Sequence, residues 1–132
     1  MKKIKAVLLI DDDEPTNFIH KKIIQGTDLV EAIHIAHSGQ EALNFLSRKD
    51  NEKPIPDLIF LDINMPAMDG WEFLAQYKML TNTATEKIII VMLTTSLNPD
   101  DEMKAAAIKE VYGYKNKPLT RLMLEEIVIK YF

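Results

Sequence analysis

The stretch LIFLDINMPAMDG, residues 58–70, is the most informative part of the sequence. Four apolar residues lead directly into Asp62, although moving a carboxylate out of water costs free energy unless the charge finds a partner. A Met-Pro step at 65–66 and the Asp69-Gly70 pair then indicate a tight turn. The sequence therefore raises the question of why an apolar strand ends on an acid and leads into a turn.

Composition and charge narrow the class of protein. The chain has 132 residues, enough for one domain with a single core, and is 47% hydrophobic and 27% charged, which is typical of a globular protein. The net charge of -4 argues against nucleic-acid binding, which normally uses a basic patch. Because the chain has no cysteine, a metal here would need oxygen or imidazole ligands.

Membrane and secretion signals are absent from the sequence. No apolar run reaches the roughly 18 residues that span a bilayer. The apolar start resembles a signal peptide, but the acids at 11–14 end the run at five residues, which is too short. We therefore predict a cytoplasmic protein with a single domain over residues 1–132, which does not bind membranes.

Short apolar runs alternate with amphipathic segments along the chain. Continuous apolar runs rich in β-branched residues are typical of parallel strands covered on both faces. A buried helical segment is the alternative for each run, but their shortness favours strands. Strands that alternate with helices predict an α/β domain. The expected strands lie at residues 6–10, 32–36, 57–61, 88–93 and, with a weaker signal, 111–114.

Helix-start signals fall between these runs. Pro15 suits a first helical turn, Ser38 and Glu41 have the spacing of a capping box, and Asn98-Pro99 combines a cap with a first-turn proline. Five strands and five helices in alternation, joined by right-handed crossovers, predict a doubly wound sheet with ligands at the carboxyl ends of the strands. The two remaining helices are expected over 71–80 and 119–132.

Polar residues fall at those carboxyl ends. The acids at 11–14 follow the first strand, Asp62 ends the third, a Thr-Thr-Ser run at 94–96 ends the fourth and Lys117 follows the fifth. Several carboxylates in one cleft repel each other unless a cation neutralises them, and oxygen ligands suit Mg²⁺. A lysine and a hydroxyl at the same edge indicate that an anion, such as a phosphoryl group, completes the site.

The ordered motifs resemble those of the receiver domains of two-component response regulators. The resemblance extends from Lys5 to Tyr131 and implies a CheY-like, flavodoxin-like α/β fold with a doubly wound five-stranded parallel sheet and five helices. The implied strand order, 2-1-3-4-5, comes from the resemblance and not from the chain's own pattern. The matching segments are LLIDDDEPT (8–16), LIFLDINMPAMDG (58–70), MLTTS (92–96) and YGYKNKP (112–118).

Residue by residue, the resemblance implies a phosphorylation site. Asp62 resembles the phosphoacceptor, which takes a phosphoryl group from a kinase phosphohistidine. Asp11 and Asp12 resemble the acidic pair that holds Mg²⁺ (or Mn²⁺) with Asp62, and the backbone carbonyl of Asn64 resembles a further ligand. Lys117 resembles the lysine that pairs with Asp62 and then with the phosphoryl oxygens. This explains the acid at the strand end, because Asp62 must be presented beside the metal.

The resemblance also implies a switch. Thr94 or Thr95 resembles the hydroxyl that moves towards the phosphoryl group, and we choose Thr95 because it keeps the family's spacing to Lys117. Tyr114 resembles the aromatic that turns inward and alters the face of the fourth helix, fifth strand and fifth helix. The Lys117-Pro118 bond is expected to be cis. The implied partners are a sensor histidine kinase or phosphotransfer protein and an unidentified downstream protein; a phosphorylation-dependent homodimer is also compatible.

The resemblance predicts a signalling domain that is not an enzyme, and two other functions stay open. Asp11-x-Asp13 resembles the motif of haloacid-dehalogenase-type phosphohydrolases, with Asp11 as nucleophile, although Glu14 replaces their usual glycine and no cap domain fits the length. The segment LDINMPAMDG has no place in that scheme. A phosphorylation-independent interaction domain of the same fold would be indifferent to Mg²⁺. Each acid alone could be a helix cap, and only the ordered combination favours a site.

The three histidines receive no functional assignment from the sequence. They lack the spacing of a metal site, and we expect them on the first helix and around the second strand, away from the acidic cluster. They are His20, His34 and His37.

Overall fold

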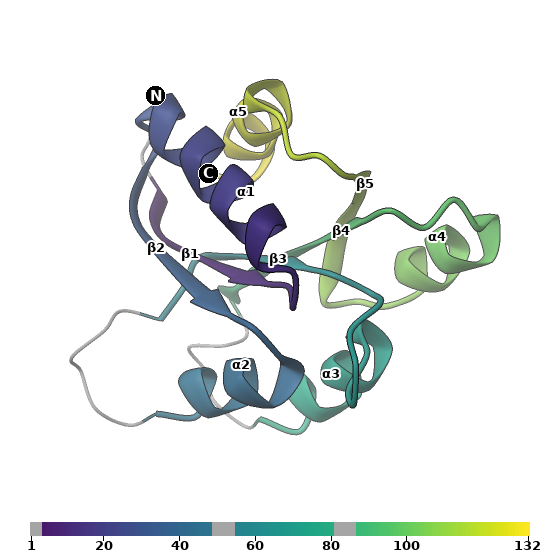
Figure 1. Ribbon diagram of the computed structural model, residues 1–132. Coiled ribbons are helices and arrows are strands. Elements are labelled where there is room, and N and C mark those ends of the chain that lie inside the picture. The colour runs from purple at the N-terminus through teal and green to yellow at the C-terminus, as the bar shows by residue number, and fades with distance from the viewer. Residues whose placement is uncertain (1–3, 49–54, 81–86) are drawn as a thin grey trace.

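The fold is a parallel sheet with helices on both faces. The computed structural model describes residues 4–48, 55–80 and 87–132. Its strand order, β2-β1-β3-β4-β5 with all pairs parallel, confirms the expected topology (Figure 1). The strands are β1 (Ile4–Ile10), β2 (Val30–Ala36), β3 (Leu58–Leu61), β4 (Ile89–Thr94) and β5 (Val111–Asn116).

The helices divide between the two faces of the sheet. In Figure 1, α1 and α5 cover one face and α2 and α3 cover the other, with α4 beside α3. None of the helices in the described ranges is long and apolar enough to cross a membrane. They are α1 (Glu14–Thr27), α2 (Gly39–Leu46), α3 (Gly70–Tyr77), α4 (Pro99–Ala106) and α5 (Arg121–Tyr131).

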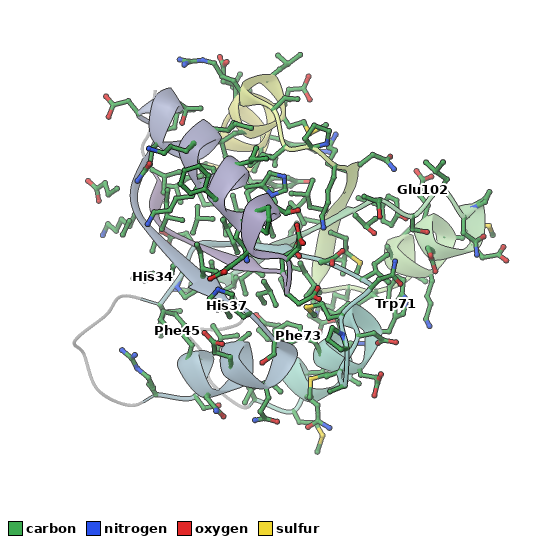
Figure 2. All side chains as sticks on the ribbon, viewed as in Figure 1. His34, His37, Phe45, Trp71, Phe73 and Glu102 are labelled. Atoms are coloured by element: carbon green, nitrogen blue, oxygen red, sulfur yellow. The ribbon has the colours of Figure 1, made fainter. Side chains whose placement is uncertain are left out.

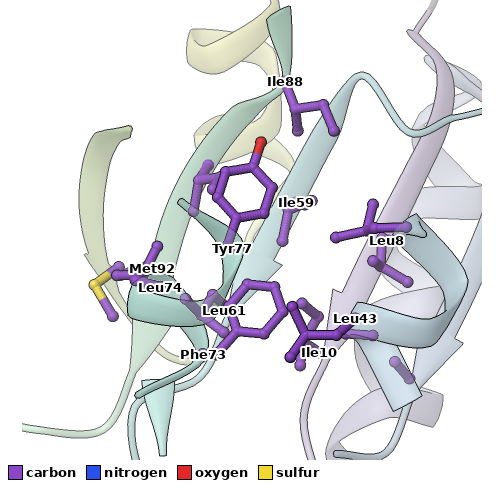
Figure 3. Packing of buried hydrophobic residues seen from close by; sticks show 14 of the residues in the cluster. Leu8, Ile10, Leu43, Ile59, Leu61, Phe73, Leu74, Tyr77, Ile88 and Met92 are labelled. Atoms are coloured by element: carbon purple, nitrogen blue, oxygen red, sulfur yellow. The ribbon is translucent and has the colours of Figure 1, made fainter. Parts of the chain in front are cut away.

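Burial on both faces explains the unbroken apolar run of β3. Alternate side chains of a strand point to opposite faces, so Leu58 and Phe60 enter the cluster under α1 and α5. Ile59 and Leu61 enter the cluster under α2 and α3, where Figure 3 shows Leu61 beside Phe73 and Ile59 beside Tyr77. A strand covered on both faces needs apolar residues at every position, and each fully buried large side chain contributes about 1.5–3 kcal/mol.

The helices begin at side-chain caps. Asp13 accepts a hydrogen bond from the Thr16 amide, Ser38 does so from Glu41, and Asn98 from Asp100, which confirms the predicted starts. The sequence reading missed the complete capping box at α3. There Asp69 accepts from the Glu72 amide, and the Glu72 carboxylate accepts from the Asp69 amide.

Gly70 lets the turn after β3 fold back onto the strand end. Its amide donates to the Ile63 carbonyl at 2.7 Å. A Cβ at this position would lie 2.6 Å from the carbonyl oxygen of Asp62 and 3.0 Å from the Cα of Ile63. Only glycine permits this approach, so α3 starts directly against the backbone of the acid that ends the strand.

Two glycine-to-alanine substitutions test this close packing. Gly70→Ala should lower the free energy of unfolding by about 1–3 kcal/mol, because backbone atoms must shift to admit the methyl group. Gly26 is the matched control, since it lies in α1 and a Cβ there would meet nothing within 4 Å. Gly26→Ala should be neutral or stabilising by up to about 1 kcal/mol. Urea denaturation measures both, and equal effects would contradict the account.

Candidate functional site

Three acids meet at the carboxyl edge of the sheet. Asp11 and Asp12 follow β1, and Asp62 follows β3, which pairs with β1. One carboxylate oxygen from each lies within 4.8 Å of the others. Asp11 and Asp62 are buried, with 5% and 6% exposure, whereas Asp12 is exposed. Within the described ranges this is the one group of three acidic or histidine side chains close enough to share a metal ion.

Lys117 bridges the two buried acids. Its Nζ lies 2.6 Å from Oδ2 of Asp11 and 3.4 Å from Oδ1 of Asp62. The lysine follows β5, and its backbone amide donates to the Thr94 carbonyl at 2.9 Å, which continues the β4–β5 pairing. The Lys117-Pro118 bond is cis, as expected. The ends of three strands are therefore joined through one ammonium group.

Burial and charge together shift the pKa values of Asp62 and Lys117. Burial raises the pKa of Asp62 above its ordinary value; the Lys117 charge lowers it and the Asp11 charge raises it, and the net shift is upward. Burial alone would lower the pKa of Lys117. The hydrogen bond to Asp11 and the two carboxylate charges outweigh burial and raise it. The lysine is therefore held charged, and Asp62 is a more basic carboxylate than an exposed one.

Asp11 is further fixed by local hydrogen bonds. Its Oδ1 accepts from the Asp13 amide at 2.9 Å, and its carbonyl accepts from Nδ2 of Asn17 at 2.8 Å. Hard oxygen donors that are buried and close together fit Mg²⁺ or Mn²⁺, which would offset their repulsion. Asn64 is exposed on the turn after Asp62, and its carbonyl ligand role stays a prediction.

The candidate hydroxyls lie at the end of β4. Thr94 is fully buried, and its Oγ1 accepts from the Ser96 amide at 3.1 Å, whereas Thr95 is exposed. The Tyr114 hydroxyl donates to the Ser96 carbonyl at 3.3 Å, so the aromatic side chain of β5 contacts the loop that follows the threonines. The choice of Thr95 stays a prediction.

The expectation that the histidines lie away from the acids is wrong for His20. This residue is 3% exposed and lines a small cavity whose polar lining residues are Asp11, Asn17, Asp62 and His20 itself. Its Nε2 accepts a hydrogen bond from the Leu119 amide at 3.3 Å. Burial, and then the Lys117 charge, lower its pKa below the ordinary histidine value, although Asp11 raises it.

A signal for His20 was present in the sequence. Asn17, His20 and Ile24 follow one another at helical spacing and form the buried face of α1. The other two histidines have different surroundings. His34 packs against Phe45 with ring centroids 5.1 Å apart, and His37 lies 3.6 Å from the Glu41 carboxylate, both near α2 (Figure 2).

Fold and site together define a doubly wound α/β domain with an acidic, lysine-containing site at its topological switch point. The family model described as "Response regulator receiver domain" matches residues 7–129. The chain therefore belongs to the response regulator receiver domain family. Receiver domains are signalling domains of two-component systems and bind Mg²⁺ or Mn²⁺ at an acidic pocket.

Individual relatives agree with this assignment. The chain is 33% identical over 99 residues to the response regulator Rcp1 of Synechocystis sp., covering 74% of this chain and 66% of Rcp1. It covers 26% of a probable cyclic di-GMP phosphodiesterase of Vibrio cholerae, so that protein is much longer.

Solved structures resemble the whole fold. A two component response regulator from Cytophaga hutchinsonii superposes with a TM-score of 0.90 and 39% identity, covering 98% of both chains. The Mn²⁺-bound form of Rcp1 has a TM-score of 0.76 and 29% identity, covering 93% of this chain and 91% of that one.

The raised pKa of Asp62 predicts a stabilising substitution. A carboxyl whose folded pKa exceeds its unfolded value destabilises the fold once ionised, and this penalty disappears as pH falls towards the ordinary value of 3.8. In metal-free buffer at pH 7, Asp62→Asn should therefore raise the free energy of unfolding by on the order of 1 kcal/mol, and the gain should shrink in acid. Urea denaturation at several pH values measures it.

Asp57→Asn is the matched control. Its carboxylate accepts from the amides of Lys5 and Ala6 at 3.0 and 3.2 Å, so losing the charge should not stabilise the fold. A destabilised Asp62→Asn protein would contradict the electrostatic account.

Proposed function

We propose that the chain accepts a phosphoryl group on Asp62 from a sensor histidine kinase or phosphotransfer protein, in a reaction that requires Mg²⁺ or Mn²⁺. The observation that carries the proposal is the buried Asp62 carboxylate between Lys117 and the acids Asp11 and Asp12. The Mn²⁺-bound Rcp1 structure supports the choice of ion. The single-domain organisation over 1–132 and the cytoplasmic location stay predictions.

The chemistry is a transfer between two nucleophiles. An Asp62 oxygen attacks the phosphorus of the donor phosphohistidine, a new O–P bond forms and the N–P bond breaks, leaving its electron pair on the imidazole, which takes up a proton. The divalent ion supplies charge neutralisation for the phosphoryl oxygens. The Lys117 ammonium provides a second positive charge at the same place, because it already lies 3.4 Å from Asp62.

The contacts favour Asp62 over Asp11 as the nucleophile. Both oxygens of Asp11 are engaged, Oδ2 by Lys117 at 2.6 Å and Oδ1 by the Asp13 amide. Asp62 has a longer contact to Lys117, and burial raises its pKa, so its carboxylate is more basic than an exposed one and is held less closely by the lysine. This argues against the phosphohydrolase alternative and supports a signalling domain that is not an enzyme.

The proposed output surface is the face of α4, β5 and α5. Tyr114 connects β5 to the loop before α4 through the Ser96 carbonyl, so a change at the site can reach this face. Each of these three elements exposes at least one large apolar side chain, which a bound protein would cover. The downstream protein or a second copy of the chain would bind there. These side chains are Met103, Tyr112, Leu122 and Ile129.

Phosphorylation by a small donor tests the proposal. Incubation with acetyl phosphate and Mg²⁺ should give a phosphoryl adduct by intact mass, and chelation of Mg²⁺ should abolish it. The adduct should vanish in Asp62→Asn and only weaken in Asp11→Asn. An adduct that survives Asp62→Asn but not Asp11→Asn would establish the phosphohydrolase reading. No adduct, with or without Mg²⁺, would favour the phosphorylation-independent alternative.

Asp12→Asn and Asp13→Asn form a matched pair for the metal dependence. Asp12→Asn should raise the Mg²⁺ concentration needed for the adduct by about tenfold or more, equivalent to ~1.4 kcal/mol. Asp13→Asn removes a neighbouring charge but keeps a side chain suited to capping α1, so its Mg²⁺ requirement should be unchanged. Equal effects would show a general charge effect instead of a ligand role.

Substitutions of the two threonines should affect different properties, the rate of adduct formation for Thr95 and the stability of the fold for Thr94. Thr95→Val should slow adduct formation while changing the unfolding free energy by less than about 0.5 kcal/mol, because the side chain is exposed. Thr94→Val should destabilise the fold by about 1–3 kcal/mol, because it removes the buried acceptor of the Ser96 amide. Time courses of adduct formation measure the rates, and urea denaturation measures the unfolding free energies. A normal rate in Thr95→Val with a slow Thr94→Val would transfer the role to Thr94.

A further inference from the structure

The buried face of α1 contacts both sides of the Asp11–Lys117 ion pair. Asn17 and His20 lie one turn apart on this face and are 2% and 3% exposed. Asn17 Nδ2 donates to the Asp11 carbonyl at 2.8 Å, on the acid's side of the pair. His20 Nε2 accepts from the Leu119 amide at 3.3 Å, on the lysine's side. One helix face therefore contacts the two loops whose side chains meet in the site.

We propose that His20 is a positioning residue for Lys117, which it holds in place through the Leu119 amide; the inference rests on the proposed function. The segment from Lys117 to Leu119 is fixed at both ends by hydrogen bonds from its backbone amides. The Lys117 amide donates to the Thr94 carbonyl at 2.9 Å, and the Leu119 amide donates to His20. Without the histidine, the second of these attachments is lost, and the lysine side chain starts from a less constrained backbone.

The hydrogen bond determines the state of the imidazole. A backbone amide can only donate, so Nε2 must carry the lone pair, and the proton of the neutral ring lies on Nδ1. An apolar side chain would be the ordinary occupant of a buried helix face, because burying a polar group costs free energy unless it is hydrogen-bonded. His20 meets that condition through Leu119, whose side chain is 1% exposed.

His20 does not act as the N-terminal cap of α5. The N-cap of α5 is Thr120, whose hydroxyl accepts a hydrogen bond from the Met123 amide, so α5 has its own start signal. The bond from His20 lies one residue earlier, inside the segment that connects α5 to the site lysine. His20 shares its cavity with Asp11 and Asp62, so the constraint acts beside the proposed phosphoacceptor.

The test compares His20→Leu with His20→Gln. Leucine fills the space without an acceptor, whereas the glutamine oxygen can accept from Leu119. With saturating Mg²⁺, His20→Leu should form the acetyl-phosphate adduct about tenfold more slowly, since small misplacements of reacting groups have effects of this size or larger. His20→Gln should recover the rate to within about threefold, and the Mg²⁺ requirement should change in neither variant.

Nuclear magnetic resonance provides readouts that need no phosphorylation. In the wild type, Nδ1 of His20 should be protonated and Nε2 unprotonated. The Lys117 side-chain resonances should shift in His20→Leu and return towards wild type in His20→Gln. His37→Gln, at an exposed histidine beside Glu41, is the control and should leave them unchanged.

Three outcomes would overturn the inference. His20→Leu could lower the unfolding free energy yet keep the wild-type adduct rate and Lys117 resonances, which would make the histidine merely structural. Protonation of Nε2 would remove the acceptor. A glutamine variant as slow as the leucine variant, with Lys117 still displaced, would show that the acceptor is not the cause. Absence of any wild-type adduct would instead count against the proposed function, while the Lys117 resonances still decide the positioning role.

Discussion

The contact of Lys117 with Asp11 and Asp62 is the interaction on which the site depends. Three carboxylates converge at the sheet edge, and one ammonium group reaches the two that are buried. When all are ionised, an excess of two negative charges remains, which a single divalent cation neutralises. The same arrangement leaves Asp62 more basic than an exposed acid. The proposed metal affinity and the proposed nucleophilicity of Asp62 would both follow from this one cluster of charges.

The surrounding scaffold serves to hold that cluster. Gly70 brings the start of α3 against the Asp62 carbonyl. On α3, the half-buried Trp71 faces Lys104 of α4, whose Nζ lies 4.6 Å from the ring centroid, and Figure 2 shows Trp71 beside α4. The Tyr114 hydroxyl donates a hydrogen bond to the Ser96 carbonyl in the loop before α4. Part of the proposed output surface, α4 with the loop before it, therefore contacts two elements that adjoin the site, α3 and β5.

Much of the fold could be predicted because its signals are local. Apolar runs reveal strands covered on both faces, and Ser38 and Asn98 reveal helix starts, whereas the strand order needed a family resemblance. Helical spacing indicated that His20 is buried, but its hydrogen bond was missed because Leu119 is distant in sequence and donates through its backbone, which leaves no side-chain pattern. Counting residues selected Thr95 by its spacing to Lys117 but could not show that Thr94 is buried and that Thr95 is exposed, because burial depends on how the end of β4 is covered.

The central claim, that Asp62 is the phosphoacceptor, is tested most directly on the unaltered chain. Borohydride reduces an aspartyl phosphate to homoserine, which marks the modified residue permanently. After incubation with acetyl phosphate and Mg²⁺, reduction and peptide mass mapping should place homoserine at position 62. Homoserine at position 11, or an adduct that leaves Asp62 unmodified, would contradict the account.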